Sequence, residues 1–405
     1  MLYILSVWCD IIYYMKKDLR KENSRSTDGK KVRESGLELL RIIAAFMIMM
    51  HHAVQHGSEN DYALIEGALS VNQFWSAFLG SWGQTGVAIF IIISSWFCQE
   101  KDYRFSTGHV IKIVAQTWFT CALIAAGIFL SGMVVTDGVY WYELLTPFSL
   151  NGQYWFVYAY LIFYCIMPFL RSAVNSLSAG RLKFLCVVAA VCYACICHLW
   201  VANTVLNFML IYIITGYLKR HPGNLIEKYR YVIAAVSFAA IVVILEVYAY
   251  RASLGNPADY IEKMRFYNDG YPFFLYIFAF SVFYIFKNSN IKHSGLINVI
   301  SKTALGTYLI SENGLMSGAF GRGVLWNYLI NIEEFFRSDK YPLLLIASVS
   351  VVFAICVVIE LIRIYTVERL FFGNKGIFKK AGVWLDNRIM TWVKKSDDAL
   401  EIRKN

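Results

Sequence analysis

Charge is what this sequence has least of. Only 16% of its 405 residues are Asp, Glu, Lys or Arg, whereas 58% are hydrophobic. Soluble domains are usually about a quarter charged. The shortage of charge therefore excludes an ordinary soluble domain and predicts an integral membrane protein.

Several motifs of soluble enzymes and transporters are also absent. The sequence contains no Gly-rich phosphate loop, no G-x-S-x-G turn and no zinc-protease signature. We find no internal repeat of the kind that transporters use. The net charge of +10 comes from basic residues in short segments between apolar runs. This distribution indicates the orientation of the chain in the membrane. We therefore expect no nucleic-acid partner.

Paired cysteines are lacking as well. Of the nine cysteines, eight lie in or at the ends of apolar runs, and no pair is spaced across extramembrane loops, which argues against a disulfide framework. Residues 192–198 contain a C-x2-C-x-C-H pattern. We interpret it as helix packing rather than a metal site, and we expect no bound metal.

Long apolar segments are abundant. Each is close to the length of about 20 residues that a membrane-spanning helix needs. They cover residues 37–54, 73–98, 108–130, 153–171, 183–200, 203–218, 231–250, 271–287, 295–316 and 342–363. We predict an all-α integral membrane protein with about ten transmembrane helices. The region 183–218 holds two helices only if residues 201–204 turn tightly, so nine or eleven spans remain alternatives.

Basic residues are distributed unevenly over the segments between these spans. With an inside N-terminus, the outside segments hold six of the 38 Lys and Arg residues, which leaves 32 inside. The six are Arg251, Lys263, Arg265, Arg322, Arg337 and Lys340. The positive-inside rule then predicts a multi-pass protein of the cell membrane with cytoplasmic N- and C-termini.

The two ends of the chain differ from the membrane region. Residues 1–34 form a basic cytoplasmic segment, and its apolar start is too short to span a bilayer, so we suspect that translation begins at Met15. Residues 35–365 form the membrane domain. Residues 366–405 alternate basic and apolar side chains, which predicts an amphipathic cytoplasmic tail on the inner leaflet.

The first apolar segment carries ionisable residues. Arg41 and His52 are eleven residues apart, so on a helix they lie within about 20° of one face and roughly 16 Å apart along the axis. His51 is rotated by about 100° from His52, and Glu38 and His56 each lie about 60° from Arg41. Such residues normally face a polar cavity inside a membrane protein. We favour a functional site over a snorkelling Arg with two packing histidines.

Four segments together resemble a known family. They are the R-x10-H pattern of Arg41 and His52, GVAIFIIISSWF (86–97), NGQYWFVYAYLIFYCIMPFL (151–170) and SKTALGTYLISEN (301–313). This set resembles the family-three membrane acyltransferases over roughly residues 35–365. Two departures stand out: Ser311 and Glu312 replace a common His and acidic residue, and His109 and Lys112 stand near the place of two Arg residues.

The resemblance implies an acyltransferase of a bacterial cell membrane, many members of the family being O-acetylating enzymes of surface polysaccharides. The donor would be cytoplasmic acyl-CoA, acetyl-CoA foremost, acting as a co-substrate with no bound cofactor. The acceptor would be a hydroxyl of a cell-surface or lipid-linked saccharide such as an exopolysaccharide. The alternatives are a carrier or flippase for a lipid-linked saccharide, without chemistry, and a membrane receptor domain.

His52 and Arg41 are the candidate catalytic residues. A hydroxyl that attacks a thioester needs a base near neutral pH, and a His side chain, with an ordinary pKa of about 6.5, is suited to that. His52 could act as this base or as a transient acyl carrier. Arg41 could bind a CoA phosphate, or could orient His52 through an acid or a water.

Lys112 and His109, at the inner end of the third span, could add positive charge for the CoA phosphates. Interfacial snorkelling explains them equally well.

Four further residues are candidates for an acceptor cavity. Glu312 lies deep in its span, where it needs a partner such as Arg322 or His52, unless the helix ends near residue 310 and the carboxylate is solvated. Tyr154 and Trp155 could stack on a sugar ring, although we favour their assignment to the aromatic belt of the membrane interface.

Overall fold

The computed structural model describes residues 13–19, 34–57, 70–99, 105–131, 154–196, 203–254, 273–317, 324–373 and 376–402. Over these residues the chain is helical and contains no strand. It forms two compact units, which are described separately. Unit 1 comprises residues 1–17, 104–147 and 358–405, and unit 2 comprises residues 18–103 and 148–357.

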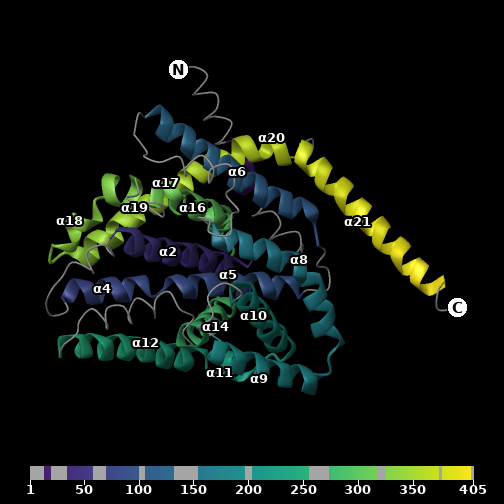
Figure 1. Cartoon of the computed structure of the whole chain (residues 1–405), viewed down its shortest axis with the longest axis horizontal. Coiled ribbons are helices and arrows are strands. Elements are labelled where there is room, and N and C mark those ends of the chain that lie inside the picture. The colour runs from purple at the N-terminus through teal and green to yellow at the C-terminus, as the bar shows by residue number, and fades with distance from the viewer. Residues whose placement is uncertain are drawn as a thin grey trace. The chain divides into compact units, whose positions relative to one another are not determined.

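Unit 2 is arranged around one helix, α2 (Ser35–Gly57), which packs against α5, α4, α14, α15 and α16 (Figure 1). Its other described helices are α4 (Val71–Gly80), α5 (Gly83–Cys98), α8 (Trp155–Ser176), α9 (Ala179–Ile196), α10 (Asn203–Arg220), α11 (Leu225–Lys228), α12 (Arg230–Ser253), α14 (Phe273–Lys287), α15 (Gly295–Ile300), the 3-10 turn η1 (Ser301–Thr303), α16 (Ala304–Ser311), α17 (Gly314–Ser317), the π-helix η2 (Val324–Leu329), α18 (Ile332–Phe336) and most of α19 (Tyr341–Arg363).

Unit 1 is smaller and contains α6 (Thr107–Leu130) and the last turns of α19. The π-helix η3 (Ile364–Glu368), α20 (Arg369–Phe372) and α21 (Ile377–Ile402) continue the chain from α19. An ion-pair network joins α6 to this C-terminal segment. Lys112 pairs with Glu368, which also pairs with Arg363 at 3.1 Å, and Arg363 pairs with Glu360 at 2.9 Å.

Six helical segments in the described part of the chain are long and apolar enough to cross a membrane. They are Ser35–Gly57, Val71–Cys98, Thr107–Leu130, Trp155–Ser176, Arg230–Arg251 and Tyr341–Phe372. A shorter apolar helix covers Phe273–Lys287. The predicted all-α membrane architecture is therefore confirmed in its class, while the number ten and the cytoplasmic placement of both termini stay predictions.

The predicted span 73–98 is present as two helices, α4 and α5, with a break at Ser81 and Trp82. The Ser81 hydroxyl donates to the Ala77 carbonyl, and His51 Nδ1 lies 2.7 Å from the Gly80 carbonyl oxygen. Gly83 packs against the His51 ring so closely that a Cβ there would lie 2.5 Å from His51 Cγ. The break is stable because these polar partners satisfy the freed backbone groups inside protein.

The predicted span 295–316 is wrong as one continuous helix. The structure divides it into α15, η1, α16 and α17. The Ser301 hydroxyl, at the α15–η1 junction, donates to Glu38 of α2, and the Ser35 hydroxyl donates to Asn298 at 3.1 Å. The Ser35 hydroxyl also accepts a bond from Ser294 N at 2.9 Å, so a polar group of α2 satisfies a backbone donor at the start of α15. Irregular backbone at membrane depth is tolerated only where protein surrounds it.

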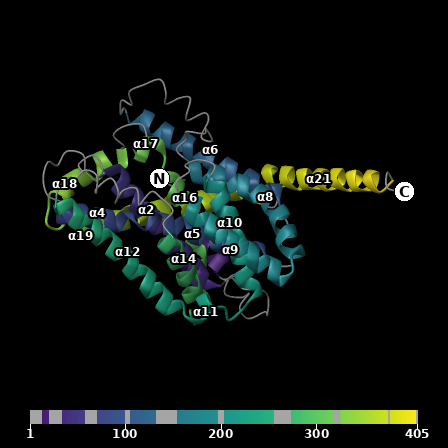
Figure 2. The same ribbon diagram turned by 60° about the horizontal axis from the view of Figure 1, so that its bottom comes forward.

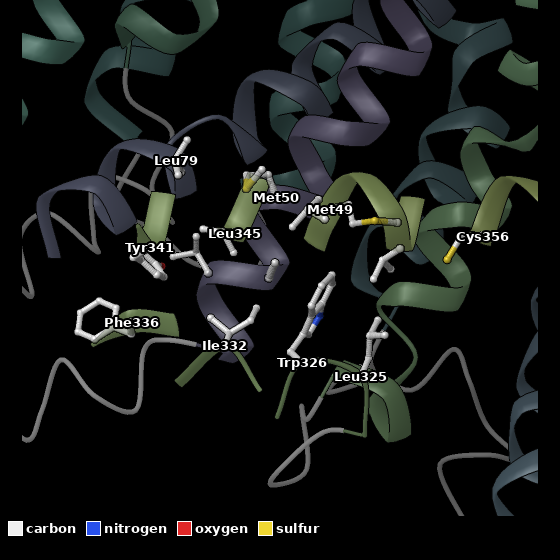
Figure 3. Packing of buried hydrophobic residues seen from close by; sticks show 14 of the residues in the cluster. Met49, Met50, Leu79, Leu325, Trp326, Ile332, Phe336, Tyr341, Leu345 and Cys356 are labelled. Carbon is white, nitrogen blue, oxygen red and sulfur yellow. The ribbon is translucent and has the colours of Figure 1, made fainter. Parts of the chain in front are cut away.

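A buried apolar cluster fixes the half of α2 that carries the histidines (Figure 3). Met49 and Met50 of α2 lie in it beside Trp326 of η2, which is fully buried, and Leu345 of α19. Because lipid tails are as apolar as these side chains, the cluster is stabilised by close van der Waals packing, which also restricts the motion of its members. The register of this end of α2 relative to η2, α18 and α19 is thereby fixed.

Candidate active site

His52 and Glu312 meet in the interior of unit 2. The His52 Nδ1 atom lies 2.7 Å from Glu312 Oε2, and the two side chains are 6% and 8% exposed. The other carboxylate oxygen, Oε1, lies 3.2 Å from His56 Nε2. One carboxylate therefore lies between two imidazoles of α2, His52 and His56, which are four residues apart and share a helix face.

The end of α16 brings Glu312 to this position. The helix stops at Ser311, and Glu312 is its C-cap residue, with the backbone N–H bonded to the Tyr308 carbonyl at 2.9 Å. Asn313 Oδ1 then accepts a bond from Leu315 N. The helix thus ends close to residue 310, as one alternative held, but Glu312 is buried against the histidines rather than solvated. Of the two proposed partners, His52 is the one found; Arg322 lies outside the described residues.

Tyr154, at the start of α8, connects to the same end of α16. Its hydroxyl donates to the Leu309 carbonyl at 2.7 Å and accepts a bond from Asn313 Nδ2 at 3.1 Å. The Tyr308 ring contacts both the His52 ring, at 5.9 Å between centroids, and the Tyr154 ring, at 6.0 Å. Tyr154 therefore helps to place Glu312 through Asn313, a contact that the sequence did not indicate.

Trp155, the next residue, has its described contact outside the His52 site. It is partly exposed, and its ring meets that of Phe156 at 6.0 Å. The structure shows no contact between Trp155 and the described residues of the His52 site. Its assignment to the aromatic belt and its role toward an acceptor both stay predictions.

His51 is separated from the His52 site, although the two rings are only 5.5 Å apart. Its Nδ1 atom contacts Gly80 of the α4–α5 break. The rotation of about 100° from His52 directs the His51 ring to the α4–α5 break, and this contact assigns His51 to packing.

Arg41 lies near the opposite end of α2. Its Nη1 atom donates to both carboxylate oxygens of Glu38, at 2.9 and 3.0 Å, and its guanidinium lies 5.7 Å from the Phe97 ring centroid. Glu38 also accepts the bond from the Ser301 hydroxyl. The acid beside Arg41 is thus Glu38, and no described contact joins Glu38 to His52. Binding of a CoA phosphate by Arg41, and orientation of His52 through an acid or a water, both stay predictions.

Lys112 and His109 belong to unit 1. The Lys112 ammonium pairs with Glu368, and His109 lies in the first turn of α6, where its backbone N–H bonds to the Ser106 carbonyl. The charge of Lys112 is therefore already matched by an acid in its own unit. A role of either residue toward an acyl-CoA remains untested.

The arrangement around His52 suits proton transfer. No hydrogen bond to a described residue engages His52 Nε2, whereas Nδ1 faces a carboxylate. A carboxylate this close to Nδ1 stabilises, by its charge, the imidazolium that forms when Nε2 takes a proton. Within the described residues no group of three or more His, Cys, Asp and Glu side chains could hold a metal ion.

Two members of this site were not assigned from the sequence. His56 was placed only by its angle to Arg41, although its spacing of four residues from His52 indicates a shared face. Asn313 gave no signal at all, because its contact with Tyr154 depends on how α8 packs against α16. The R-x10-H pattern, by contrast, identified His52 directly.

A comparison with protein families places the chain in a family. Residues 34–361 match the model of the family described as acyltransferase domain, the family-three acyltransferases. The match covers α2 with Arg41 and His52, and α16 with Glu312. No curated protein and no solved structure shows significant similarity to the chain. Since the match covers most of its length, the chain belongs to the family-three acyltransferases and is a membrane acyltransferase.

Proposed function

We propose that the chain moves an acyl group, acetyl foremost, from cytoplasmic acyl-CoA to a hydroxyl of a cell-surface or lipid-linked saccharide. The observation that carries this proposal is the buried pair of His52 and Glu312, 2.7 Å apart, between α2, which is long and apolar enough to span a membrane, and the end of α16. A buried ion pair contributes little to stability on average. Inside a membrane protein, ionisable side chains are a mark of function.

The reaction assigns a role to each ring nitrogen of His52. Nε2 accepts the proton of the acceptor hydroxyl, whose oxygen attacks the thioester carbonyl carbon. The carbon–sulfur bond breaks as the ester forms, and the imidazolium returns the proton to the leaving thiolate. Glu312 stabilises the imidazolium while it exists.

His56 is a positioning residue in this scheme. Its Nε2 atom lies 3.2 Å from Glu312 Oε1, so it restrains the carboxylate oxygen that His52 does not use. A carboxylate restrained at Oε1 keeps its other oxygen, Oε2, beside His52 Nδ1, and fixed catalytic geometry is a large part of enzymatic rate.

Arg41 is the proposed donor-binding residue. It lies about 16 Å along α2 from His52, at the end that the charge bias places toward the cytoplasm. Only its Nη1 atom bonds to Glu38, and Nε and Nη2 make no hydrogen bond to a described residue. These two donors have the fork geometry that binds phosphate oxygens.

Mass spectrometry of surface glycans tests the proposal. Cells with the intact protein should carry an acyl increment that is lost in cells without it and in cells with His52→Ala. Transfer from labelled acetyl-CoA by the purified protein in nanodiscs should be lost in the same variant. If a saccharide crosses the membrane unmodified and without CoA, the protein is a carrier and the proposal fails.

A further inference from the structure

A polar joint attaches α21 to the first turn of α6 in unit 1. The Asp386 carboxylate accepts hydrogen bonds from Thr107 N and Thr107 Oγ1, each at 2.7 Å, and from Ser106 Oγ at 3.3 Å. Gly108 and Gly382 touch here, and a Cβ on Gly382 would lie 2.6 Å from Gly108 Cα. The joint positions this part of α21 at the start of a membrane-spanning helix.

The first residues of α21 also pack on the end of another span. The Phe378 ring lies 5.0 Å from the Phe372 ring and 5.8 Å from the Phe371 ring, both in α20, where the apolar segment Tyr341–Phe372 ends. Figure 2 shows α21 continuing from there as one long straight helix, with its far part beyond α6. The ends of two membrane-spanning segments, α6 and Tyr341–Phe372, thus fix the position of the first residues of α21.

An apolar stripe continues along α21 past these contacts. At about 100° per residue, Phe378, Leu385, Ile389 and Trp392 fall within about 60° of one another on the helix surface. Phe378 and Leu385 are half-buried. Ile389 is 42% exposed and Trp392 70% exposed. The stripe is therefore covered by protein where it starts and uncovered farther along.

Positive charge accompanies the stripe. The basic residues of segment 374–395 are Lys375, Lys379, Lys380, Arg388, Lys394 and Lys395, and its single acid is Asp386. Three further acids, Asp397, Asp398 and Glu401, follow in the last turns of α21, so the excess of positive charge is confined to residues 374–395. Because Asp386 is used in the joint with α6, it does not offset this charge on the open side of the helix. By the same helix geometry, Lys379 and Arg388 flank the stripe on either side, while Lys380, Asn387 and Thr391 face away from it.

We propose that α21 lies on the membrane surface and binds anionic lipid headgroups. The stripe enters the boundary between headgroups and acyl chains, where Trp side chains are enriched. Lys379 and Arg388 reach anionic headgroups at its edges. The family match ends at residue 361, so this lipid-binding helix lies beyond the matched region and is independent of the proposed reaction.

Hydrogen exchange measured by mass spectrometry on the full chain tests this assignment. In nanodiscs that contain phosphatidylglycerol, the amides after Asp386 should exchange about tenfold more slowly than in nanodiscs of phosphatidylcholine alone. Ile389→Ser with Trp392→Ser should remove the protection, and Lys379→Gln with Arg388→Gln should remove its dependence on the anionic lipid. The matched control Asn387→Ser with Thr391→Ser, on the opposite side of the helix, should leave it unchanged.

Exchange in the six membrane spans reports whether each variant is folded. Equal exchange of α21 in both kinds of nanodisc would overturn the proposal. So would protection that appears only when two copies share a nanodisc, because the stripe would then be covered by a second chain.

Discussion

The two halves of α2 each pair a basic or titratable side chain with an acid, but they do so differently. Near its start, Arg41 pairs with Glu38, three residues earlier on the same helix. Farther along, His52 pairs with Glu312, which α16 supplies. The Arg41 side chain is 24% exposed, whereas His52 is 6% exposed.

The two pairs depend on the tertiary structure to different degrees. A pair three residues apart forms whenever the helix forms. The pair of His52 and Glu312 exists only because α16 ends at Ser311 and Asn313 is tied to Tyr154. We therefore expect changes near Arg41 to affect donor binding, and changes around His52 to affect the chemical step.

The largest effect is expected at His52. His52→Ala should lower acyl transfer by about a hundredfold or more, because the general base or acyl carrier is removed. His51→Ala is the control: it removes the contact with Gly80 and should cost about 1–2 kcal/mol of stability while transfer is largely kept. Turnover of labelled acyl-CoA, at equal amounts of folded protein, checks both. Loss with His51→Ala and retention with His52→Ala would show that the face assignment is wrong.

A smaller loss is expected when the acid is made neutral. Glu312→Gln should lower kcat by about tenfold to a hundredfold with little change in KM, because the imidazolium loses its counter-charge. His56→Ala should lower kcat less, and His56→Gln, which keeps an N–H donor, should recover part of it. If Glu312→Gln changed only KM, the carboxylate would belong to substrate binding. The pH profiles of kcat measure the coupling of the three groups.

At the other half of α2, the expected effect is on affinity. Arg41→Lys should raise KM for acyl-CoA by about tenfold with kcat nearly unchanged, because an ammonium cannot reproduce the guanidinium fork. Glu38→Gln removes the paired charge but keeps the guanidinium, so it serves as the matched control and should weaken donor binding less. An unchanged CoA affinity with a collapsed kcat would assign Arg41 to the chemical step instead.

The smallest effect is expected at an acid outside the spans, Glu227 in α11. Burial raises the pKa of Glu227, but hydrogen bonds from Gly223 N, Asn288 and Lys287 outweigh it, and the pKa is lowered overall. A lowered pKa gives stability that is present above the unfolded value, about 4.3, and is lost as the pH falls through the folded value. Solvent screens the Lys287 pair, so Glu227→Gln should cost only about 0.5 kcal/mol.

Thermal unfolding in nanodiscs at two pH values measures this contribution. The wild type and Glu227→Gln should differ slightly at pH 7 and converge near pH 3. A difference that grows as the pH falls would contradict the sign of the shift. The expected effect of Glu227→Gln is therefore a small loss of stability, much smaller than the effect expected at Glu312, whose pair is enclosed by helices.

Much of this protein follows from its sequence because the signals are local or periodic. Apolar length identifies membrane helices, and the eleven-residue spacing puts Arg41 and His52 on one face. The pair of Glu38 and Arg41 and the shared face of His52 and His56 are also local consequences of helix geometry. The break of 295–316 at Ser301 was not predicted, whereas an end near residue 310 was one alternative. Hydropathy does not report where a polar side chain of another helix can bond to an irregular segment.

What only the tertiary structure decided is the partner of each buried polar group. Glu312 had Arg322, His52 or solvent as alternatives, and the end of α16 selected His52 together with His56. Lys112 looked available for a phosphate, but Glu368 pairs with it. These pairings depend on which helices pack together, and in an apolar chain most side chains are interchangeable as packing partners. A buried charge is not, because it needs an oppositely charged or hydrogen-bonding partner at a fixed distance.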